Sequence, residues 1–469
     1  MKNQMKTALI IFIIALIIRI IFVFSSPIPY WDETVYANIG YDLSRNPFDY
    51  SLQKSGWSDF IPASDDFNYN WPKLGFRAPL LPYSLSLFYL FNLDFLISFF
   101  IPIIGALSAV LVFYLGKKLF NQQAGVYSAV IFSLIPLHVI FSSKILTDAY
   151  ATFFIILSFI SFYKGYEENN KTFKILFGLF LALALLARYT VLWIIPVFFF
   201  YFLIKDKFLK FLKDKYLWFA VLIFFLTLSP WFIYGISEYN NPFGAFIHGV
   251  RAASYWGGTQ SWSFFFQYSW EALSIIAPIF LFSLFYIFYK KQIIKKQIYL
   301  LFIWFLFFLI IAMLMPHKET RFILPIIPSI CLLTGFALDK IKKYKNLVFV
   351  LIIIILFVSL SSLFIKDYNR SYTNTNKCFL QANTFLKSQG NIKIVTDQSS
   401  IVYYLTKQET MYYPPINLIP ENYHILFSDY GMPLFNEENQ KIKQELDSNF
   451  KKIFECSLNS SYSAVYISS

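Results

Sequence analysis

The sequence has few charged residues and few cysteines, and several catalytic motifs are missing from it. Charged residues make up 14% of the 469 positions, about half the share found in a soluble globular domain. Three cysteines, at positions 331, 378 and 456, predict no disulfide framework and no CxxC metal spacing. Neither GxxxxGK[ST] nor HExxH occurs, which excludes a P-loop and a zinc-peptidase helix.

Apolar residues are abundant instead. Hydrophobic residues make up 57% of the chain and aromatic residues 21%. Because about 20 apolar residues cross a bilayer as one helix, the sequence predicts a polytopic α-helical membrane protein with about eleven spans. The expected spans are 7–24, 97–116, 124–142, 147–163, 173–187, 189–204, 216–236, 271–289, 298–315, 321–338 and 347–365. A shorter run at 78–92 begins with APLLP, which suits a helix lying at the membrane interface.

The net charge is +13, and the basic residues that produce it are distributed as the expected membrane topology requires. With a cytoplasmic N-terminus, the connections on the inner side hold twenty Lys and Arg, and those on the outer side hold nine. This asymmetry is typical of membrane proteins and argues against nucleic acid as the partner. It predicts that the long first connection and the C-terminus lie outside. No small-residue cleavage site follows the first apolar run, so we expect a retained helix and not a signal peptide.

The composition changes after residue 365. Residues 366–469 are polar and balanced in charge, and we expect them to form a small extracytoplasmic α/β domain following a transmembrane domain of residues 1–365. The pattern predicts strands at 392–397, 423–427 and 464–467. It predicts helices near 379–388, 399–407 and 438–455.

The expected outer face carries acidic residues. Asp32 and Glu33 follow directly on the first apolar run, and Asp148 lies at the outer end of the fourth. Acidic residues also favour helix N-termini, and Thr147 suits a capping role. However, ionisable groups at a membrane boundary often mark functional sites. A carboxylate there can take a proton from an attacking hydroxyl or stabilise an oxocarbenium ion.

Basic residues are expected on the same side. The candidates for binding a phosphate are Arg77, Arg188, His317, Lys318 and Arg321. Arginine binds phosphate with two parallel hydrogen bonds and keeps its charge. A polyprenyl phosphate is a phosphate that a long apolar tail holds at a membrane.

Four segments carry a resemblance to a known family. They are WDETVY after the first apolar run, RAPLLPY from Arg77, LTDAY around Asp148, and HKETRF from His317. In this order, the sequence resembles GT-C glycosyltransferases that use a polyprenyl-phosphate sugar. It is similar to protein O-mannosyltransferases and to the aminoarabinose transferase of lipid A. HKETRF also resembles the HKExRF signature of the mannosyltransferases that build glycosylphosphatidylinositol and N-glycan precursors.

The resemblance implies roles for single residues. Asp32 is the expected catalytic carboxylate, Glu33 orients donor or acceptor, and Asp148 matches the family's second acid. Arg77 stands where the family has a lysine near the donor phosphate. The resemblance implies no cofactor and no metal, although Asp32, Glu33 and Asp148 can in principle bind a divalent cation. The sequence has no Trp-Trp-Asp motif, which argues against transfer of a whole oligosaccharide to asparagine.

The expected function is the transfer of one sugar, with inversion, from a dolichyl or undecaprenyl phosphate. The acceptor is a hydroxyl of a protein, lipid or glycan at the outer face of the cell membrane. Two alternatives stay open at this point: a polytopic transporter or lipid flippase, and a protein that only binds the lipid carrier. Transporters usually show internal repeats and polar groups at mid-membrane, and neither is evident here. A pure binder should have lost the Asp32 carboxylate, which is present.

Overall fold

The computed structural model describes residues 2–56, 77–205, 210–255, 258–341, 343–459 and 461–468. The chain divides into two compact units. The helical unit comprises Met1–Val23, Gly75–Leu81 and Phe95–Leu363. The mixed unit comprises Phe24–Leu74, Pro82–Asp94 and Phe364–Ser469. The mixed unit therefore contains the C-terminal segment together with most of the first connection.

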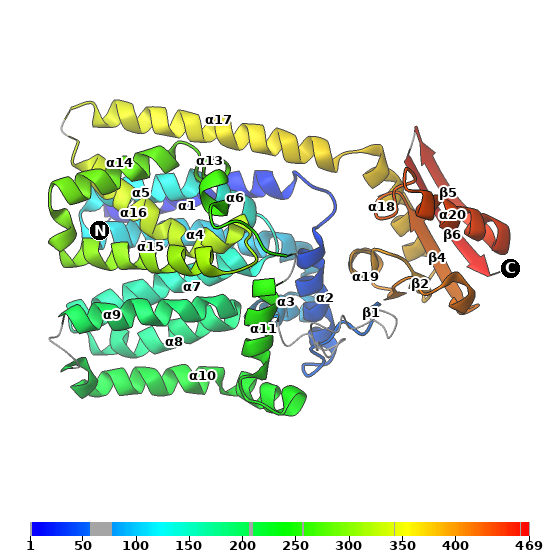
Figure 1. Ribbon diagram of the computed structural model, residues 1–469, viewed down its shortest axis with the longest axis horizontal. Helices are drawn as coiled ribbons and strands as arrows, with labels where there is room; N and C mark the ends of the chain where they lie inside the picture. Colours follow the sequence, from blue (N-terminus) through cyan, green and yellow to red (C-terminus); the bar gives the residue numbers. More distant parts are fainter. Residues whose placement is uncertain are drawn as a thin grey trace. The chain divides into compact units, whose positions relative to one another are not determined.

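Helices make up the helical unit (Figure 1). Its longer helices are α1 (Lys2–Val23), α4 (Ile97–Leu119), α5 (Gln122–Leu134), α7 (Thr147–Phe162), α8 (Lys171–Ala187), α9 (Ile195–Lys205), α10 (Lys215–Tyr239), α11 (Gly244–Tyr255), α14 (Ile276–Tyr289), α15 (Lys296–Leu314) and α16 (Ile327–Asp339). Shorter ones are α6 (Pro136–Ser142), α12 (Phe264–Gln267), α13 (Ser269–Leu273), η3 (Tyr189–Ile194), η4 (Lys210–Lys213) and η6 (Thr320–Ile326). Helix α3 (Leu80–Leu90) begins in this unit and continues into the mixed unit, as does α17 (Lys345–Ser371).

Each of the eleven expected spans contains helix, but not every one is a long straight helix. Among the described residues, seven helices are long and apolar enough to cross a membrane, or eight if α5 and α6 count as one span. The eleven crossings are therefore not confirmed. The bend of 60° between α5 and α6 has a local cause, because Pro136 disfavours helical geometry at Ile135, which is extended.

Close backbone contact holds the core of the helical unit together. A Cβ atom at Gly125 would lie 2.7 Å from the backbone nitrogen of Lys117, so only glycine lets α4 and α5 approach this closely. Small residues serve this purpose in many membrane proteins. Helices α7 and α16 are almost entirely buried among the others, and they form the centre of the unit.

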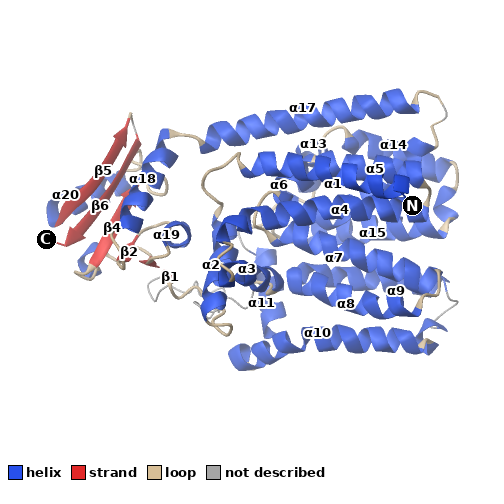
Figure 2. Cartoon of the chain, turned by 180° about the vertical axis from the view of Figure 1, so that it is seen from behind, coloured by secondary structure: helices blue, strands red, loops and turns tan. Residues whose placement is uncertain are grey.

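The mixed unit is built on one six-stranded sheet in the order β1-β3-β2-β4-β6-β5. Its longer strands β4, β5 and β6 are drawn as red arrows in Figure 2. The strands are β1 (Ser55–Gly56), β2 (Lys393–Val395), β3 (Glu409–Met411), β4 (Tyr423–Ser428), β5 (Phe450–Leu458) and β6 (Ser461–Ser468). The first four in this order pair in parallel, and β6 pairs antiparallel with both β4 and β5. The helices are α2 (Trp31–Arg45), α18 (Asn374–Ser388), α19 (Ser399–Thr406) and α20 (Glu437–Asn449).

The sequence predicted most elements of residues 366–469, but the unit differs from that expectation in several respects. The expected helix at 438–455 ends at Asn449, and the residues that follow form β5. Strand β3 was not expected, because its three residues are too few to show an alternating pattern. Strand β1 comes from the first connection and pairs with β3, a long-range contact that no local pattern encodes.

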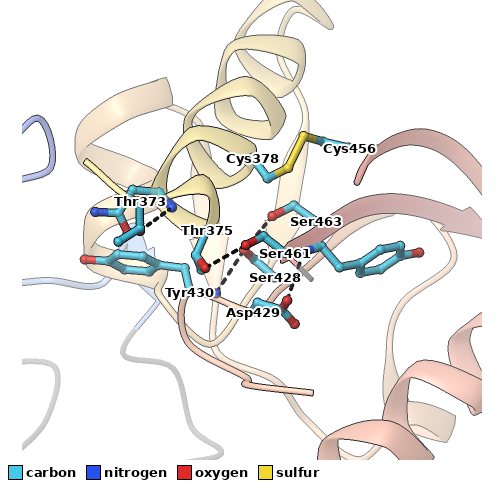
Figure 3. Close-up of a disulfide and its surroundings, with 11 residues drawn as sticks. Thr373, Thr375, Cys378, Ser428, Asp429, Tyr430, Cys456, Ser461 and Ser463 are labelled. Carbon is cyan, nitrogen blue, oxygen red and sulfur yellow. Dashed lines mark hydrogen bonds between the residues drawn. A yellow bond between two sulfur atoms is a disulfide. The ribbon is translucent and has the colours of Figure 1, made fainter. Parts of the chain in front are cut away.

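The prediction of no disulfide framework is wrong for two of the three cysteines. Cys378 of α18 and Cys456 of β5 form a disulfide although 78 residues separate them in the chain (Figure 3). Their Cα atoms lie 5.4 Å apart, within the range that a disulfide requires. The fold, and not the spacing in the sequence, brings them together. Cys331 is buried and free.

Candidate active site

Asp32 and Glu33 lie in the first turn of α2, in the mixed unit. Tyr30 precedes the helix in an extended conformation, with φ −65° and ψ 158°. The Tyr30 backbone N–H donates to Glu33 Oε1 at 3.0 Å, which is the contact that an acid at this position makes in a capping box. Glu33 is 5% exposed, whereas Asp32 is partly exposed. The two adjacent carboxylates therefore differ in environment, and Glu33 stabilises the start of the helix.

A row of buried polar side chains attaches α2 to α19 within the mixed unit. The Thr34 and Ser400 hydroxyl oxygens lie 2.9 Å apart, and Asn38 Nδ2 donates to the Ser400 carbonyl at 2.8 Å. One helical turn further on, the Tyr403 hydroxyl donates to Asp42 Oδ1 at 2.7 Å. Burial raises the pKa of Asp42, although the bonds from Tyr403 and Lys54 oppose that effect.

Sequence reasoning missed this attachment. Residues 34, 38 and 42 are spaced by four, which places them on one face of a helix. Polar residues at that spacing, in a helix that is otherwise largely buried, are the signal that could have revealed it. The attachment means that the helix carrying Asp32 is part of the packed core of the mixed unit.

In the helical unit, Asp148 and Arg188 form a buried ion pair. Arg188 Nη1 lies 2.8 Å from Asp148 Oδ1, and the Asp148 side chain is 1% exposed. Arg188 also donates to the hydroxyl oxygens of Thr147, at 3.4 Å, and Thr190, at 3.1 Å. Thr147 does not cap α7, because Leu146 occupies the N-cap position without a side-chain hydrogen bond. The second expected acid and one of the expected arginines are thus direct partners.

The HKETRF segment forms a second charged group in the same unit. Glu319 lies between two partners: Arg321, whose Nη2 donates to Oε1 at 3.0 Å, and His317, whose Nε2 lies 3.0 Å from the same oxygen. Burial alone would raise the pKa of Glu319, but Arg321 and His317, with a contribution from Arg188, outweigh it and lower the pKa. The Arg188 guanidinium lies 5.4 Å from the centre of the Phe322 ring. This packing joins the segment to the Asp148–Arg188 pair.

Lys318 has a different environment from the other basic candidates. Its Nζ donates to the carbonyls of Met315 at 2.7 Å and Gln260 at 3.0 Å, and it is buried. These bonds hold the HKETRF segment in place. They use two of the three donors that an ammonium group has.

Arg77 lies just before α3, next to the segment that follows Arg188. The Tyr189 hydroxyl donates to the Arg77 carbonyl at 3.1 Å and accepts a bond from the Trp231 indole at 2.6 Å. The Arg77 side chain is partly exposed. Within the helical unit, the backbone of Arg77 is therefore bound to the side chain of Tyr189, the residue that follows Arg188.

Arg19 is a buried charge that sequence reasoning did not select. It lies in α1 and hydrogen-bonds to Ser142 Oγ at 2.7 Å and to His138 Nδ1 at 2.8 Å. These contacts tie α1 to α6. A charged residue inside an apolar run is the signal that could have identified it.

The expected site residues thus divide between the two units. The helical unit holds Asp148, Arg188, His317, Lys318, Arg321 and Arg77, and the mixed unit holds Asp32 and Glu33. In the part of the chain that the structure describes, no three His, Cys, Asp or Glu residues gather closely enough to hold a metal ion.

Part of the chain matches a known protein family. Residues 77–234 match the model of the family described as dolichyl-phosphate-mannose-protein mannosyltransferase. An uncharacterized protein from Aquifex aeolicus (strain VF5) is 27% identical over 306 residues, which are 62% of this chain. That match spans 59% of the Aquifex protein.

Solved structures share the fold. ArnT from Cupriavidus metallidurans bound to undecaprenyl phosphate superposes with a TM-score of 0.72 at 11% identity, covering 97% of each chain. The oligosaccharyltransferase AglB from Archaeoglobus fulgidus, in complex with an inhibitory peptide and a dolichol-phosphate, gives a TM-score of 0.60 at 12% identity. That match covers 98% of this chain and 74% of AglB.

These matches confirm the resemblance seen in the sequence, and they favour an enzyme over a transporter or a lipid-binding protein. The matched residues 77–234 include Arg77, Asp148 and Arg188. They end before the HKETRF segment, so its likeness to the HKExRF signature stays a prediction. The chain is an integral membrane protein that shares its fold with ArnT and AglB, and its residues 77–234 match the dolichyl-phosphate-mannose-protein mannosyltransferase family.

Proposed function

We propose that the protein transfers a single sugar from a polyprenyl-phosphate donor to a hydroxyl group of a protein, lipid or glycan. The family match and the shared fold support this proposal. The structurally similar ArnT is bound to undecaprenyl phosphate, and AglB is in complex with a dolichol-phosphate. A donor with such a tail suits the apolar helical unit. Attack by the acceptor from the side opposite the phosphate inverts the anomeric carbon.

In this proposal, Asp32 is the base that takes the proton from the acceptor hydroxyl. The observation that carries this assignment is the difference between the two neighbouring acids. Glu33 is buried and binds the backbone N–H of Tyr30, whereas Asp32 is partly exposed in the same first turn. The phosphate is a good leaving group, so the main demands are positioning and removal of that proton.

The donor phosphate is assigned to the basic residues of the helical unit. Arg77 and Arg188 are the main candidates, with Arg321 and His317 beside them. Asp148 holds Arg188 in place through their ion pair. Lys318 contributes chiefly by fixing the HKETRF segment, which carries His317 and Arg321. No resident metal is assigned.

The test is a transfer assay with the purified full-length enzyme. Synthetic polyprenyl-phosphate sugars are offered together with lipid, glycan and peptide acceptors, and the anomeric configuration of the product is read by NMR. We expect transfer from the lipid monophosphate and the opposite configuration in the product. Activity with nucleotide sugars alone, or a product of retained configuration, would contradict the proposal.

We also propose eleven crossings, with the domain of residues 366–469 and the active site outside the cell membrane. The asymmetry of basic residues supports this topology. The Cys378–Cys456 disulfide supports it independently, because disulfides persist in oxidising compartments and are rare in the cytosol.

Cysteine labelling tests this topology. Phe435 is 89% exposed, and the remaining free thiol of the chain, Cys331, is buried. Phe435→Cys should therefore react with a membrane-impermeant maleimide on intact cells, and the unchanged chain serves as the control. Labelling only after permeabilisation would place the domain inside.

A further inference from the structure

An apolar cavity lies between α8, α9 and α10, and the proposed mechanism does not use it. Its volume is about 320 Å³, which falls at the lower end of the range for ligand pockets, roughly 300–1,000 Å³. Every side chain that lines it is apolar, and most are phenylalanines. The cavity therefore suits a hydrocarbon chain and offers nothing to a polar ligand.

The cavity has a buried floor and an exposed rim. Phe177, Phe198 and Phe202 form the floor and are almost fully buried. Phe199 and Phe225 form the rim and are 44% and 49% exposed. In an integral membrane protein, such a rim opens towards lipid. A chain can then enter sideways from the bilayer without crossing water.

Basic residues stand at one end of this cavity. Phe211 and Leu217 line it, and Lys213 and Lys215 lie between them in the sequence. Both lysines are exposed. In the part of the chain that the structure describes, neither forms an ion pair. Two other lysines nearby differ in this respect, because Lys174 pairs with Asp214 at 2.6 Å and Lys205 pairs with Glu167 at 2.6 Å.

Trp218 marks the level of the membrane surface at this end of α10. It is 55% exposed, and its indole N–H donates to the Leu212 carbonyl at 2.9 Å. Tryptophan favours the boundary between headgroups and hydrocarbon. Lys213 and Lys215 therefore lie at the depth of the lipid headgroups, and Val221 and Phe225 lie one to two helical turns deeper.

We propose that this cavity binds an anionic phospholipid, with one acyl chain in the phenylalanine-lined space and the phosphate beside Lys213 and Lys215. The charge of the two lysines selects an anionic headgroup over a zwitterionic one, since basic side chains at this depth attract acidic lipids. The cavity provides a defined place for the chain, which a flat lipid-facing surface does not.

The experiment uses the delipidated full-length protein in detergent micelles and compares phosphatidylglycerol with phosphatidylcholine. Binding is counted by native mass spectrometry, and the melting temperature is measured in parallel. We expect phosphatidylglycerol to bind more tightly and to raise the melting temperature more. In Lys213→Gln/Lys215→Gln, its affinity should fall roughly tenfold to thirtyfold, from about 1 kcal/mol per lysine. Lys290→Gln/Lys291→Gln, an exposed pair in another helix connection, should bind as the unchanged protein does.

A second pair of variants tests the place of the acyl chain. Val221→Trp fills the cavity and should reduce phospholipid binding, whereas Leu222→Trp, on the lipid-facing side of the same helix, should not. Equal binding of the two phospholipids, or unchanged binding by the lysine variant, would overturn the proposal. It would also be overturned if undecaprenyl phosphate displaced phosphatidylglycerol at far lower concentration, because the occupant would then be a polyprenyl tail. The lysine variant changes only exposed side chains, so its result stands even if Val221→Trp does not fold.

Discussion

The acids proposed for the active site lie in two contrasting environments. Asp148 is buried in the helical unit and has a guanidinium partner at 2.8 Å. Asp32 is partly exposed in the first turn of a helix that Ser400 holds along its first half and Tyr403 holds near its far end. A carboxylate bound to arginine is a poor base, because its negative charge is stabilised. Asp32, in the first turn of α2, is only partly buried. This difference in burial is why we propose Asp32, and not Asp148, as the base.

The largest expected effect follows from replacing Asp32. Asp32→Asn keeps the volume of the side chain but cannot accept a proton, so turnover should fall by roughly 10²–10⁴-fold. Protein yield and donor binding should stay nearly unchanged. Glu33→Gln is the matched control, because its amide oxygen can still accept the Tyr30 N–H. Near-normal transfer by Asp32→Asn in the purified enzyme would end the assignment of Asp32 as the base and direct attention to Asp148.

The second prediction tests the structural side of the comparison. Asp148→Ala leaves the Arg188 guanidinium largely buried without its carboxylate, and the free energy of unfolding should fall by roughly 3–5 kcal/mol. The double change Asp148→Leu/Arg188→Met should recover most of that stability, because replacing a buried pair with apolar residues is often neutral. Thermal denaturation in detergent measures both.

The double variant also separates stability from function. If Arg188 binds the donor phosphate, the stable double variant will still transfer sugar poorly. Full transfer by a stable double variant would remove both residues from the site.

Much of the helical unit was predictable, because hydrocarbon allows little variety in backbone structure. Runs of apolar residues located helix at all eleven expected places. Their lengths were less predictable: Pro136 divides one run, and Ser274, with a φ of 53°, interrupts another. Such breaks depend on single residues, and the average hydrophobicity of about 20 residues does not reveal them.

The site was predictable only in its parts. Sequence patterns placed Asp148 and Arg188 on the same side of the membrane, but the ion pair between them depends on how α7 and α8 pack. The attachment of α2 to α19 joins residues more than 360 positions apart. Contacts at that distance leave no periodic trace in a single sequence, and neither does the disulfide between Cys378 and Cys456.

The third prediction concerns the donor phosphate. Arg77→Ala should raise the KM for the donor while leaving kcat nearly unchanged, because a hydrogen bond to a charged group contributes roughly 1.5–3 kcal/mol. Arg77→Lys should restore part of the loss, since the charge remains. An unchanged KM in Arg77→Ala would mean that this side chain does not reach the donor.

A smaller effect is expected where α2 is attached to α19. Tyr403→Phe removes the hydroxyl that donates to Asp42 and leaves that buried carboxylate poorly satisfied, at a cost of roughly 1–3 kcal/mol. If this contact positions Asp32, kcat should fall while the donor KM stays constant. Tyr412→Phe, a change of the same kind outside the attachment, is the control. Equal stability and kcat in the two variants would show that the attachment is not needed.

The smallest expected effect is a dependence of stability on pH at Glu319. The folded protein lowers the pKa of Glu319 through Arg321 and His317, which outweigh burial. A carboxyl group whose pKa is lowered by folding stabilises the folded state above its unfolded pKa, about 4.3 for glutamate. That contribution disappears as the pH falls through the lowered folded-state pKa. Because Glu319 is about one-third exposed, the contribution should not exceed about 1 kcal/mol.

The measurement compares melting temperatures of the unchanged protein and Glu319→Gln from pH 7 down to pH 3. The unchanged protein should be the more stable at pH 7, and the difference should shrink towards acid pH as Glu319 takes up its proton. Glu271→Gln, which alters an exposed carboxylate of α13, should show no such trend. A difference in melting temperature that stays constant with pH would mean that Glu319 acts through the shape of the HKETRF segment and not through its charge.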